Sequence, residues 1–208
     1  MPMLTVFGRA NSINVQKVLW CCTEVGVLVD RIDAGGLHGG TDTPEYRQIN
    51  PTGLVPTLID GSFTLWESNV IVRYLAVKYG GETIFPRDLE RRFDIERWMD
   101  WQATALWPAV RPVFIALVRT QPEDRDSRAL AAAIAEAERS LALLEAELAK
   151  RPFVAGEAFS IADIPLAIAA HRWLTLHVER RALPHVERWL RSMLARAGFR
   201  EHVGHPLS

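Results

Sequence analysis

The sequence predicts an α/β domain with a mixed four-stranded sheet, followed by an all-α helical-bundle domain. Three observations support this division. Short apolar runs alternate with helical patterns over residues 1–80. Residues 89–208 are rich in Ala, Leu, Arg and Glu with helical periodicity and hold no convincing strand. Gly80, Gly81 and Pro86 lie between the two regions, so we expect residues 81–88 to form a linker.

Bulk composition indicates an ordinary globular chain. The 208 residues carry a formal net charge of −1, and neither predicted domain concentrates the basic residues that binding to nucleic-acid phosphates requires. The first residues lack a basic region that leads into a long apolar stretch, so we expect no signal peptide, and no apolar run approaches the ~18 residues of a membrane span. The two cysteines, Cys21 and Cys22, are adjacent, which is compatible with a reducing compartment. We therefore expect a cytoplasmic protein that binds neither nucleic acid nor membranes.

The first three elements are expected in the order β-α-β. Leu4–Phe7 is typical of a strand, and a helix follows with Asn11 or Ser12 as its N-cap and Gly26 at its end. Val27–Ile32 is the next predicted strand. Two such strands in one sheet pair in parallel through a right-handed crossover, so this unit predicts the parallel part of the sheet.

A glycine-rich segment, residues 35–40, follows the second strand. Neither a Lys-Ser nor a Lys-Thr pair comes after it and no helix begins there, so a surface loop is favoured over a phosphate-binding loop. Pro44–Ile49 then predicts a short helix before Asn50.

Residues 50–69 predict a hairpin that leads into a helix. Its two apolar runs, Val55–Ile59 and Phe63–Trp66, are rich in residues that favour strands. Asp60-Gly61 lies between them and is typical of a tight turn. The two strands are therefore expected to be antiparallel.

Both ends of this hairpin offer groups to a ligand. Pro56 is tolerated only at a strand's start or edge, so the amide of Val55 or Leu54 could remain available, and a cis Val55–Pro56 bond is expected. The helix after the second strand, as far as Tyr79, begins with a carboxylate, a hydroxyl and unpaired backbone N–H groups at residues 67–69. Such a helix start can receive a small polar ligand.

The second domain begins with a long helix from about Leu89. Pro108 and Pro112 are expected to bend or divide it. A second helix should start at residues 126–127 and continue along an apolar stripe to Lys150.

A capping box with a hydrophobic staple is the strongest local signal in the second domain. The Ser160 hydroxyl is expected to accept the N–H of Asp163, whose carboxylate returns to the Ser160 N–H, while Phe159 packs on Ile164. A helix follows from there, and a last one is predicted over Pro184–Ala197 before a loose tail.

Ser12 allows two interpretations. Its hydroxyl lies at the start of a helix, where the amides and the helix dipole favour an anion. A simple N-cap, worth about 1 kcal/mol, is the alternative. Because no Gly-x-Ser-x-Gly elbow is present, a hydroxyl that donates to a thiolate fits better than a nucleophilic serine.

Neither the cysteines nor the histidines predict further chemistry. Cys21 and Cys22 lack the Cys-x-x-Cys spacing at a helix start, so packing is favoured over a redox pair. His202 and His205 have a metal-like spacing without a Cys or carboxylate cluster, and we expect no metal site.

Four segments at matching spacings carry a resemblance to a known family: Ser12–Val18, Asn50–Leu58, Trp66–Asn69 and the Ala162-Asp163 core of the capping box. Through them the chain resembles the cytosolic glutathione S-transferases from Leu4 to about Arg200. The resemblance implies a thioredoxin-like N-terminal domain and a helical C-terminal domain. It is strongest toward the bacterial serine-using members, which are theta-like or nu-like.

The resemblance implies a glutathione site in the first domain. Val55, before a cis-Pro56, would pair its backbone with the cysteinyl part of glutathione, and Glu67 and Ser68 would hold the γ-glutamyl end. A carboxylate suits the glutathione α-ammonium, and a hydroxyl with N–H groups suits its carboxylate. Ser12 matches the position whose hydroxyl stabilises the thiolate, which would then attack an electrophilic carbon.

Two positions keep alternatives open. Ser12 and Asn14 occupy the places of a Thr and an Asn in nu-like relatives, which favour glutathione-dependent disulfide reduction, so Asn14 is a second catalytic candidate. Leu54, among the glutathione-binding positions, replaces the Lys or Gln of many classes. The glycine carboxylate of glutathione then lacks its usual partner, and His38 or a nearby loop residue is the alternative partner.

The resemblance also implies substrates and partners. Glutathione would be the co-substrate without a metal, and Trp107, Arg111 and Phe114 would form the pocket for a small hydrophobic electrophile. We expect a homodimer whose subunit contact lies near the first long helix of the second domain. The expected activity is transfer of alkyl or aryl groups, as in detoxification. A glutathione-dependent disulfide or peroxide reductase, or a non-catalytic binding protein on this fold, are the alternatives.

Overall fold

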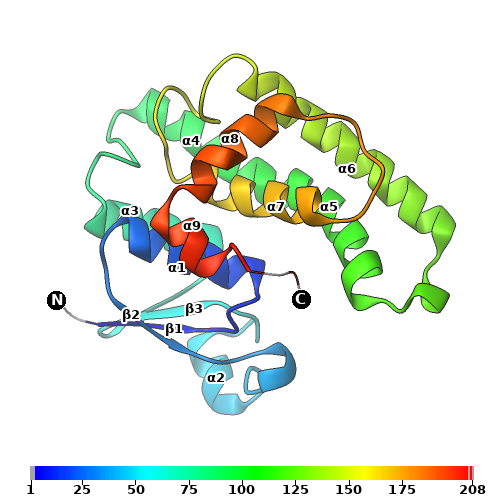
Figure 1. The fold of residues 1–208 in the computed structure, drawn as a ribbon. Helices are drawn as coiled ribbons and strands as arrows, with labels where there is room; N and C mark the ends of the chain where they lie inside the picture. Colours follow the sequence, from blue (N-terminus) through cyan, green and yellow to red (C-terminus); the bar gives the residue numbers. More distant parts are fainter. Residues whose placement is uncertain (1–2, 206, 208) are drawn as a thin grey trace. The chain divides into compact units, whose positions relative to one another are not determined.

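The computed structural model describes residues 3–205 and 207. They belong to two compact units, one built from the chain up to residue 86 together with residues 197–204, and the other mainly from residues 87–196 (Figure 1). The first unit contains the sheet and the second is helical, so the predicted α/β and all-α architecture is confirmed.

A mixed four-stranded sheet in the order β2-β1-β3-β4 forms the framework of the N-terminal unit. Its strands are β1 (Leu4–Phe7), β2 (Val29–Ile32), β3 (Thr57–Asp60) and β4 (Phe63–Trp66). β1 pairs with β2 in parallel, whereas β1–β3 and β3–β4 are antiparallel. β3 starts two residues later than predicted, because its ladder with β1 begins at the pair Phe7 and Thr57 and leaves Val55 outside it.

Helices cover both faces of this sheet. α1 (Ile13–Glu24) and α3 (Ser68–Tyr79) pack against each other and lie on one side of the sheet in Figure 1, while the short α2 (Pro44–Ile49) lies on the other. The glycine-rich segment forms a loop with one 3₁₀ turn, Gly36–His38. Completely buried side chains from the strands and from the two long helices form the core: Leu4, Val6, Val15, Val18, Leu58, Ile71 and Leu75.

The C-terminal segment packs on the N-terminal unit. The helix predicted over 184–197 ends at Leu194, and a separate helix, α9 (Ala197–His202), occupies the expected loose tail. α9 packs against α1, where the rings of Trp20 and Phe199 meet edge to face with centroids 5.2 Å apart. A Cβ on Gly198 would lie 2.3 Å from Trp20 Cδ1, so this close packing requires glycine. The sequence-based boundary assigns these residues to the second domain, whereas the structure groups residues 197–204 with the first unit.

The helical unit is built from five longer helices: α4 (Leu89–Trp101), α5 (Trp107–Phe114), α6 (Ser127–Leu148), α7 (Asp163–Thr175) and α8 (Pro184–Leu194). A π-helical turn, Gln102–Leu106, separates α4 from α5, and a second one, Ile115–Arg119, ends α5. The long first helix is therefore divided, as predicted, but the two interruptions flank α5, which itself contains Pro108 and Pro112. α7 is almost wholly buried and forms the centre of this unit.

The capping box at the start of α7 differs in detail from the prediction. The Asp163 carboxylate accepts the Ser160 N–H at 2.9 Å, as expected. The Ser160 hydroxyl accepts instead from the N–H of Ala162 and donates to the Asp163 carboxylate. Because the buried carboxylate can only accept hydrogen bonds, the Ser160 hydroxyl donates its proton to it.

Over the described part of the chain, the helices are all too short or too polar to cross a bilayer.

Candidate functional site

Three segments of the N-terminal unit converge beside the end of β1. They are the start of α1, the loop before β3 and the start of α3. Gly8 allows the first two to approach, because a Cβ there would lie 2.4 Å from Val15 Cγ2 and 3.2 Å from Val55 Cβ. The start of α3 joins α1 through a hydrogen bond of 3.2 Å that Ser68 donates to Asn14. The sequence-predicted residues of the first domain therefore share one corner of this unit.

Ser12 is the N-cap residue of α1, but its hydroxyl does not cap the helix. Its backbone is extended, with a φ of −75°, and its carbonyl accepts the Gln16 N–H at 2.9 Å. No hydrogen bond joins the hydroxyl to any other group in the part of the chain that the structure describes, although the residue is only 7% exposed. The hydroxyl is therefore available to donate to an anion at the positive end of α1.

A buried asparagine shapes the loop that leads to Val55. Asn50, 1% exposed, donates to the carbonyl of Leu54 and to the Thr57 hydroxyl, both at 2.9 Å. Its own side-chain oxygen accepts from the N–H and hydroxyl of Thr52. The Tyr46 hydroxyl completes the network, with 2.7 Å to the Leu54 carbonyl and 2.8 Å to the Thr57 hydroxyl. These bonds fix the backbone immediately before Val55.

Val55 presents an unpaired backbone edge. The Val55–Pro56 bond is cis, as predicted. Within residues 3–205 and 207, neither the N–H nor the carbonyl of Val55 takes part in a hydrogen bond. The side chain of Leu54 is 66% exposed and carries no polar group. An extended peptide could therefore pair with Val55 in the manner of an added strand.

Glu67 and Ser68 start α3 in an unusual conformation. Glu67 has a φ of +70°, which is the one positive φ of a non-glycine residue in the described chain. This conformation is costly for a side chain with a Cβ and is typical of functional sites. The Glu67 side chain is exposed and makes no ion pair among the described residues, so it can meet a cationic group. Ser68 is 6% exposed.

Lys17 is the residue of this corner that sequence reasoning missed. Its ammonium donates to the Ser68 hydroxyl at 3.5 Å, and the residue is 3% exposed. Burial lowers the pKa of Lys17 to about 7, against the opposing effect of the Glu67 carboxylate. The sequence feature that could have indicated Lys17 is its position between apolar residues of a short helix, most of which is buried in the structure.

The cysteines belong to the core, as predicted. Cys21 is 0% and Cys22 1% exposed, and the Cys21 thiol donates to the Val72 carbonyl. Burial raises the pKa of the Cys22 thiol to about 12, which keeps it protonated and unreactive.

Trp107, Arg111 and Phe114, predicted to contact an electrophile, lie on α5 of the helical unit. Trp107 is half-buried and Arg111 is exposed, whereas Phe114 is 2% exposed. The guanidinium of Arg172 lies 4.8 Å from the centroid of the Phe114 ring and 5.6 Å from that of Trp107. Phe114 is therefore part of the helical core, and Trp107 and Arg111 provide the accessible surface.

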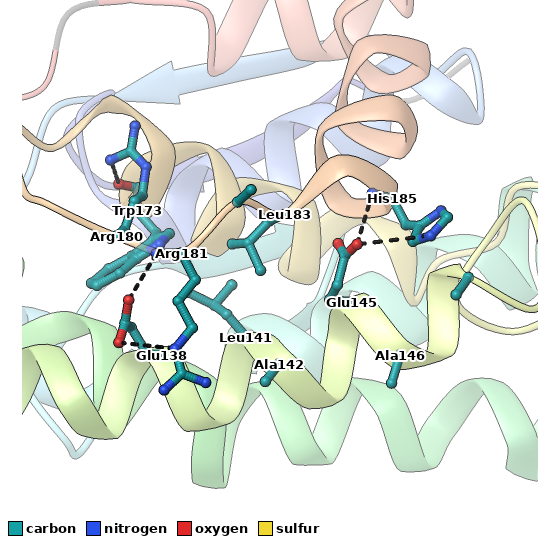
Figure 2. A pocket seen from close by; sticks show the side chains of 12 residues that line it. Glu138, Leu141, Ala142, Glu145, Ala146, Trp173, Arg180, Arg181, Leu183 and His185 are labelled. Carbon is teal, nitrogen blue, oxygen red and sulfur yellow. Dashed lines mark hydrogen bonds and ion pairs between the residues drawn. The ribbon is translucent and has the colours of Figure 1, made fainter.

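A pocket of about 220 Å³ lies between α6, α7 and the segment leading into α8 (Figure 2). The carboxylates of Glu138 and Glu145, which line this pocket, accept hydrogen bonds from the protein backbone. Glu138 accepts the backbone N–H of Arg181 at 2.9 Å, and Glu145 accepts that of His185 at 3.0 Å. The residues that line this pocket include none of the catalytic or ligand-binding residues predicted from the sequence.

Comparisons with known proteins agree on one family. Residues 2–77 match the N-terminal domain of glutathione S-transferases, and residues 127–192 match their C-terminal domain. The chain is 38% identical to the glutathione S-transferase GstB of Escherichia coli over 99% of this chain and 100% of that protein.

Solved structures give the same result. A theta class glutathione S-transferase from Xanthomonas axonopodis pv. citri, with glutathione bound, superimposes with a TM-score of 0.95 at 41% identity, over 100% of both chains. Poplar glutathione transferase F1 shares the fold with a TM-score of 0.87 at 23% identity, over 98% of both chains.

Proposed function

The chain belongs to the glutathione S-transferase family, and we propose that it binds glutathione in its N-terminal unit and conjugates the glutathione thiolate to small hydrophobic electrophiles. The observation that carries this proposal is the convergence of three groups at one corner. They are the Ser12 hydroxyl without a hydrogen-bond partner in the described chain, the unpaired backbone of Val55 and the charged start of α3.

Val55 would bind the middle of the tripeptide. Its N–H and carbonyl can pair with the cysteinyl residue of glutathione as adjacent antiparallel strands do. The network around Asn50 holds the preceding carbonyl in place, so this edge is organised before the ligand arrives. Preorganisation of this kind reduces the entropy lost on binding.

The start of α3 would bind the γ-glutamyl end. The exposed Glu67 carboxylate suits the α-ammonium of glutathione, and the Ser68 hydroxyl with the first N–H groups of α3 suits its α-carboxylate. The φ of +70° at Glu67 supports this role, because such a conformation is costly for a residue other than glycine and is typical of functional sites.

Ser12 would stabilise the thiolate. A hydrogen bond to a charged acceptor contributes about 1.5–3 kcal/mol, which corresponds to a fall of about one to two units in the thiol pKa. From a free value of about 8.5, such a fall raises the thiolate fraction at pH 7 from a few per cent to about half. The thiolate then forms the new carbon–sulfur bond as the leaving group departs with its electron pair.

Trp107 and Arg111 are the residues that we propose to contact the electrophile, since Phe114 is enclosed. Truncation of Trp107 should then raise the KM of an aromatic electrophile and leave the KM of glutathione unchanged.

A homodimer is also proposed. α4 exposes Leu89 and Phe93, at 65% and 61%, and exposed apolar side chains of this size favour a subunit contact. Phe93→Glu should convert a dimer to a monomer in light scattering. A wild-type chain that is monomeric at micromolar concentration would refute this proposal.

Asn14 supports a second candidate function, the reduction of disulfides by glutathione. Its side-chain oxygen accepts from Ser68, which leaves the amide N–H groups as the donors available to a sulfur. Ser12 and Asn14 lie two residues apart at the start of α1, so both can act on the same atom.

The test compares glutathione binding, conjugation of a panel of electrophiles and reduction of a small disulfide. Ser12→Ala should leave glutathione binding within a few-fold and lower conjugation by about 10–100-fold. Asn14→Ala separates the second candidate, because it should affect disulfide reduction more than conjugation. Ser62→Ala, an exposed serine at the hairpin turn, is the matched control. Absence of glutathione binding would refute both functions, and conjugation unaffected by Ser12→Ala would refute the role of Ser12.

A further inference from the structure

We propose that Lys17 is a positioning residue of the glutathione site, which orients the Ser68 hydroxyl and provides the positive charge that balances the γ-glutamyl carboxylate. This inference rests on the proposed function, because the carboxylate is that of bound glutathione.

Hydrogen-bond direction gives the first argument. An ammonium group only donates, so the Ser68 hydroxyl must accept from Lys17, at 3.5 Å, and its proton is directed to an acceptor, which in this structure is the oxygen of Asn14, at 3.2 Å, and in the complex would be the carboxylate. Lys17 lies one helical turn after Asn14, which places both side chains on the same face of α1. Lys17 therefore fixes the orientation of both polar residues beside the start of α3.

Burial gives the second argument. Lys17 is 3% exposed, and among the described residues no carboxylate lies within ion-pair distance of its ammonium. An apolar side chain would fill this position of α1 at lower cost, since burying an unpaired charge is expensive. A buried lysine aimed at Ser68 is best explained by an anion that arrives with the ligand.

The charged groups around Lys17 define how binding should respond to pH. Glu67, from the start of α3, is the charged residue that acts on it. On α1 itself the Cys21 thiol lies one turn further along the helix, and burial raises its pKa and keeps it neutral. From α9 the titratable contact is His202, which lies against Thr23, nearly two turns further along α1.

The pKa of Lys17, about 7, predicts proton uptake when the carboxylate binds. The bound anion favours the ammonium form and raises this pKa, so the complex holds more protons than the unliganded protein near neutral pH. Affinity should therefore be highest below pH 7 and fall about fivefold between pH 7 and pH 8, where the unliganded lysine loses its proton.

S-methylglutathione is the probe that tests this idea, because it keeps the γ-glutamyl carboxylate and lacks the thiol, whose own ionisation would release protons. Calorimetry at pH 7 in two buffers of different ionisation enthalpy should show uptake of about half a proton per site by the wild-type chain. Lys17→Met should abolish the uptake and weaken binding about tenfold at pH 6. Lys17→Arg should retain the affinity without uptake, since arginine stays charged. Lys150→Met, an exposed lysine of the helical unit, is the control and should behave as wild type.

The outcomes are distinct. Failure of the wild-type chain to bind S-methylglutathione would refute the proposed function and this inference with it. Binding without proton uptake, or uptake that persists in Lys17→Met, would overturn the role of Lys17 alone. The wild-type measurement decides the question even where Lys17→Met is too unstable to titrate.

Discussion

Asp163→Ala should destabilise the helical unit by about 3–5 kcal/mol. The Asp163 carboxylate is completely buried and accepts four hydrogen bonds. One oxygen accepts from the N–H of Val154 at 3.2 Å and from the indole of Trp189 at 2.9 Å. The other accepts from the N–H and hydroxyl of Ser160, at 2.9 and 3.2 Å.

The magnitude follows from what alanine leaves behind. Three buried N–H donors lose their acceptor, and each orphaned donor costs about 1–3 kcal/mol, although entry of water into the vacated space reduces the sum. The Ser160 hydroxyl can rotate to another acceptor and contributes less. Asp163→Asn should lose about 2 kcal/mol, because its amide nitrogen must face at least one buried N–H donor whichever way the group is turned.

Urea unfolding followed by circular dichroism provides the measurement. With a slope near 3 kcal/mol per molar urea, the midpoint for Asp163→Ala should fall by about 1–2 M. Ser160→Ala is the control, since it removes the hydroxyl and leaves three of the four bonds, at a cost of about 1 kcal/mol. A midpoint for Asp163→Ala equal to that of Ser160→Ala would refute the reasoning.

Three further predictions concern the N-terminal unit. Asp60 accepts hydrogen bonds from Lys78, Tyr79 and Tyr74; burial raises its pKa, but these bonds outweigh burial and hold the pKa below its ordinary value. Asp60→Asn should therefore cost about 1–2 kcal/mol at pH 7, and the difference from wild type should begin to shrink below about pH 4 and disappear below the lowered pKa of Asp60. A difference independent of pH would contradict this. Asn50→Ala removes the hydrogen bond from Asn50 to the Leu54 carbonyl and should raise the Kd for glutathione about tenfold. An unchanged Kd in calorimetry would show that the loop before Val55 does not depend on Asn50. Gly8→Ala places a Cβ 2.4 Å from Val15 Cγ2 at a φ of +151° and should lower the free energy of unfolding by more than about 2 kcal/mol. A melting temperature within about 2 °C of that of the wild type would contradict the steric argument.

Elements set by local chemistry were predictable to the residue. Pro44–Ile49 begins with a proline after a threonine whose hydroxyl caps the helix, and Phe63–Trp66 follows an Asp-Gly turn. Each signal lies within a few residues of the element that it defines. α9 was missed because its position depends on Trp20, far away in the chain, and on Gly198 being small enough to pack against that ring.

The candidate site was predictable only where its residues lie in short motifs. Ser12, Val55 and Glu67 occupy recognisable turns and helix starts, and the structure brings their segments together. Lys17 was not predictable, because its burial and its contact with Ser68 depend on the packing of α1 against α3 between residues 51 apart. A single sequence gives the spacing of a lysine in a helix but not the distance of its ammonium from a serine in another helix.

Two energetic costs coincide at the start of α3, and their coincidence is informative. Glu67 is held at a φ of +70°, a conformation that costs about 1–3 kcal/mol for a residue other than glycine. The buried ammonium of Lys17, without an ion pair among the described residues, is a second cost. Glycine at 67 would relieve the first cost, and an apolar residue at 17 would relieve the second. Glu67 precedes Ser68 in the chain, Lys17 donates to the Ser68 hydroxyl, and the two residues carry opposite charges. The proposed γ-glutamyl site would account for both costs, because a zwitterionic ligand end would present its ammonium to Glu67 and its carboxylate to Ser68 and Lys17.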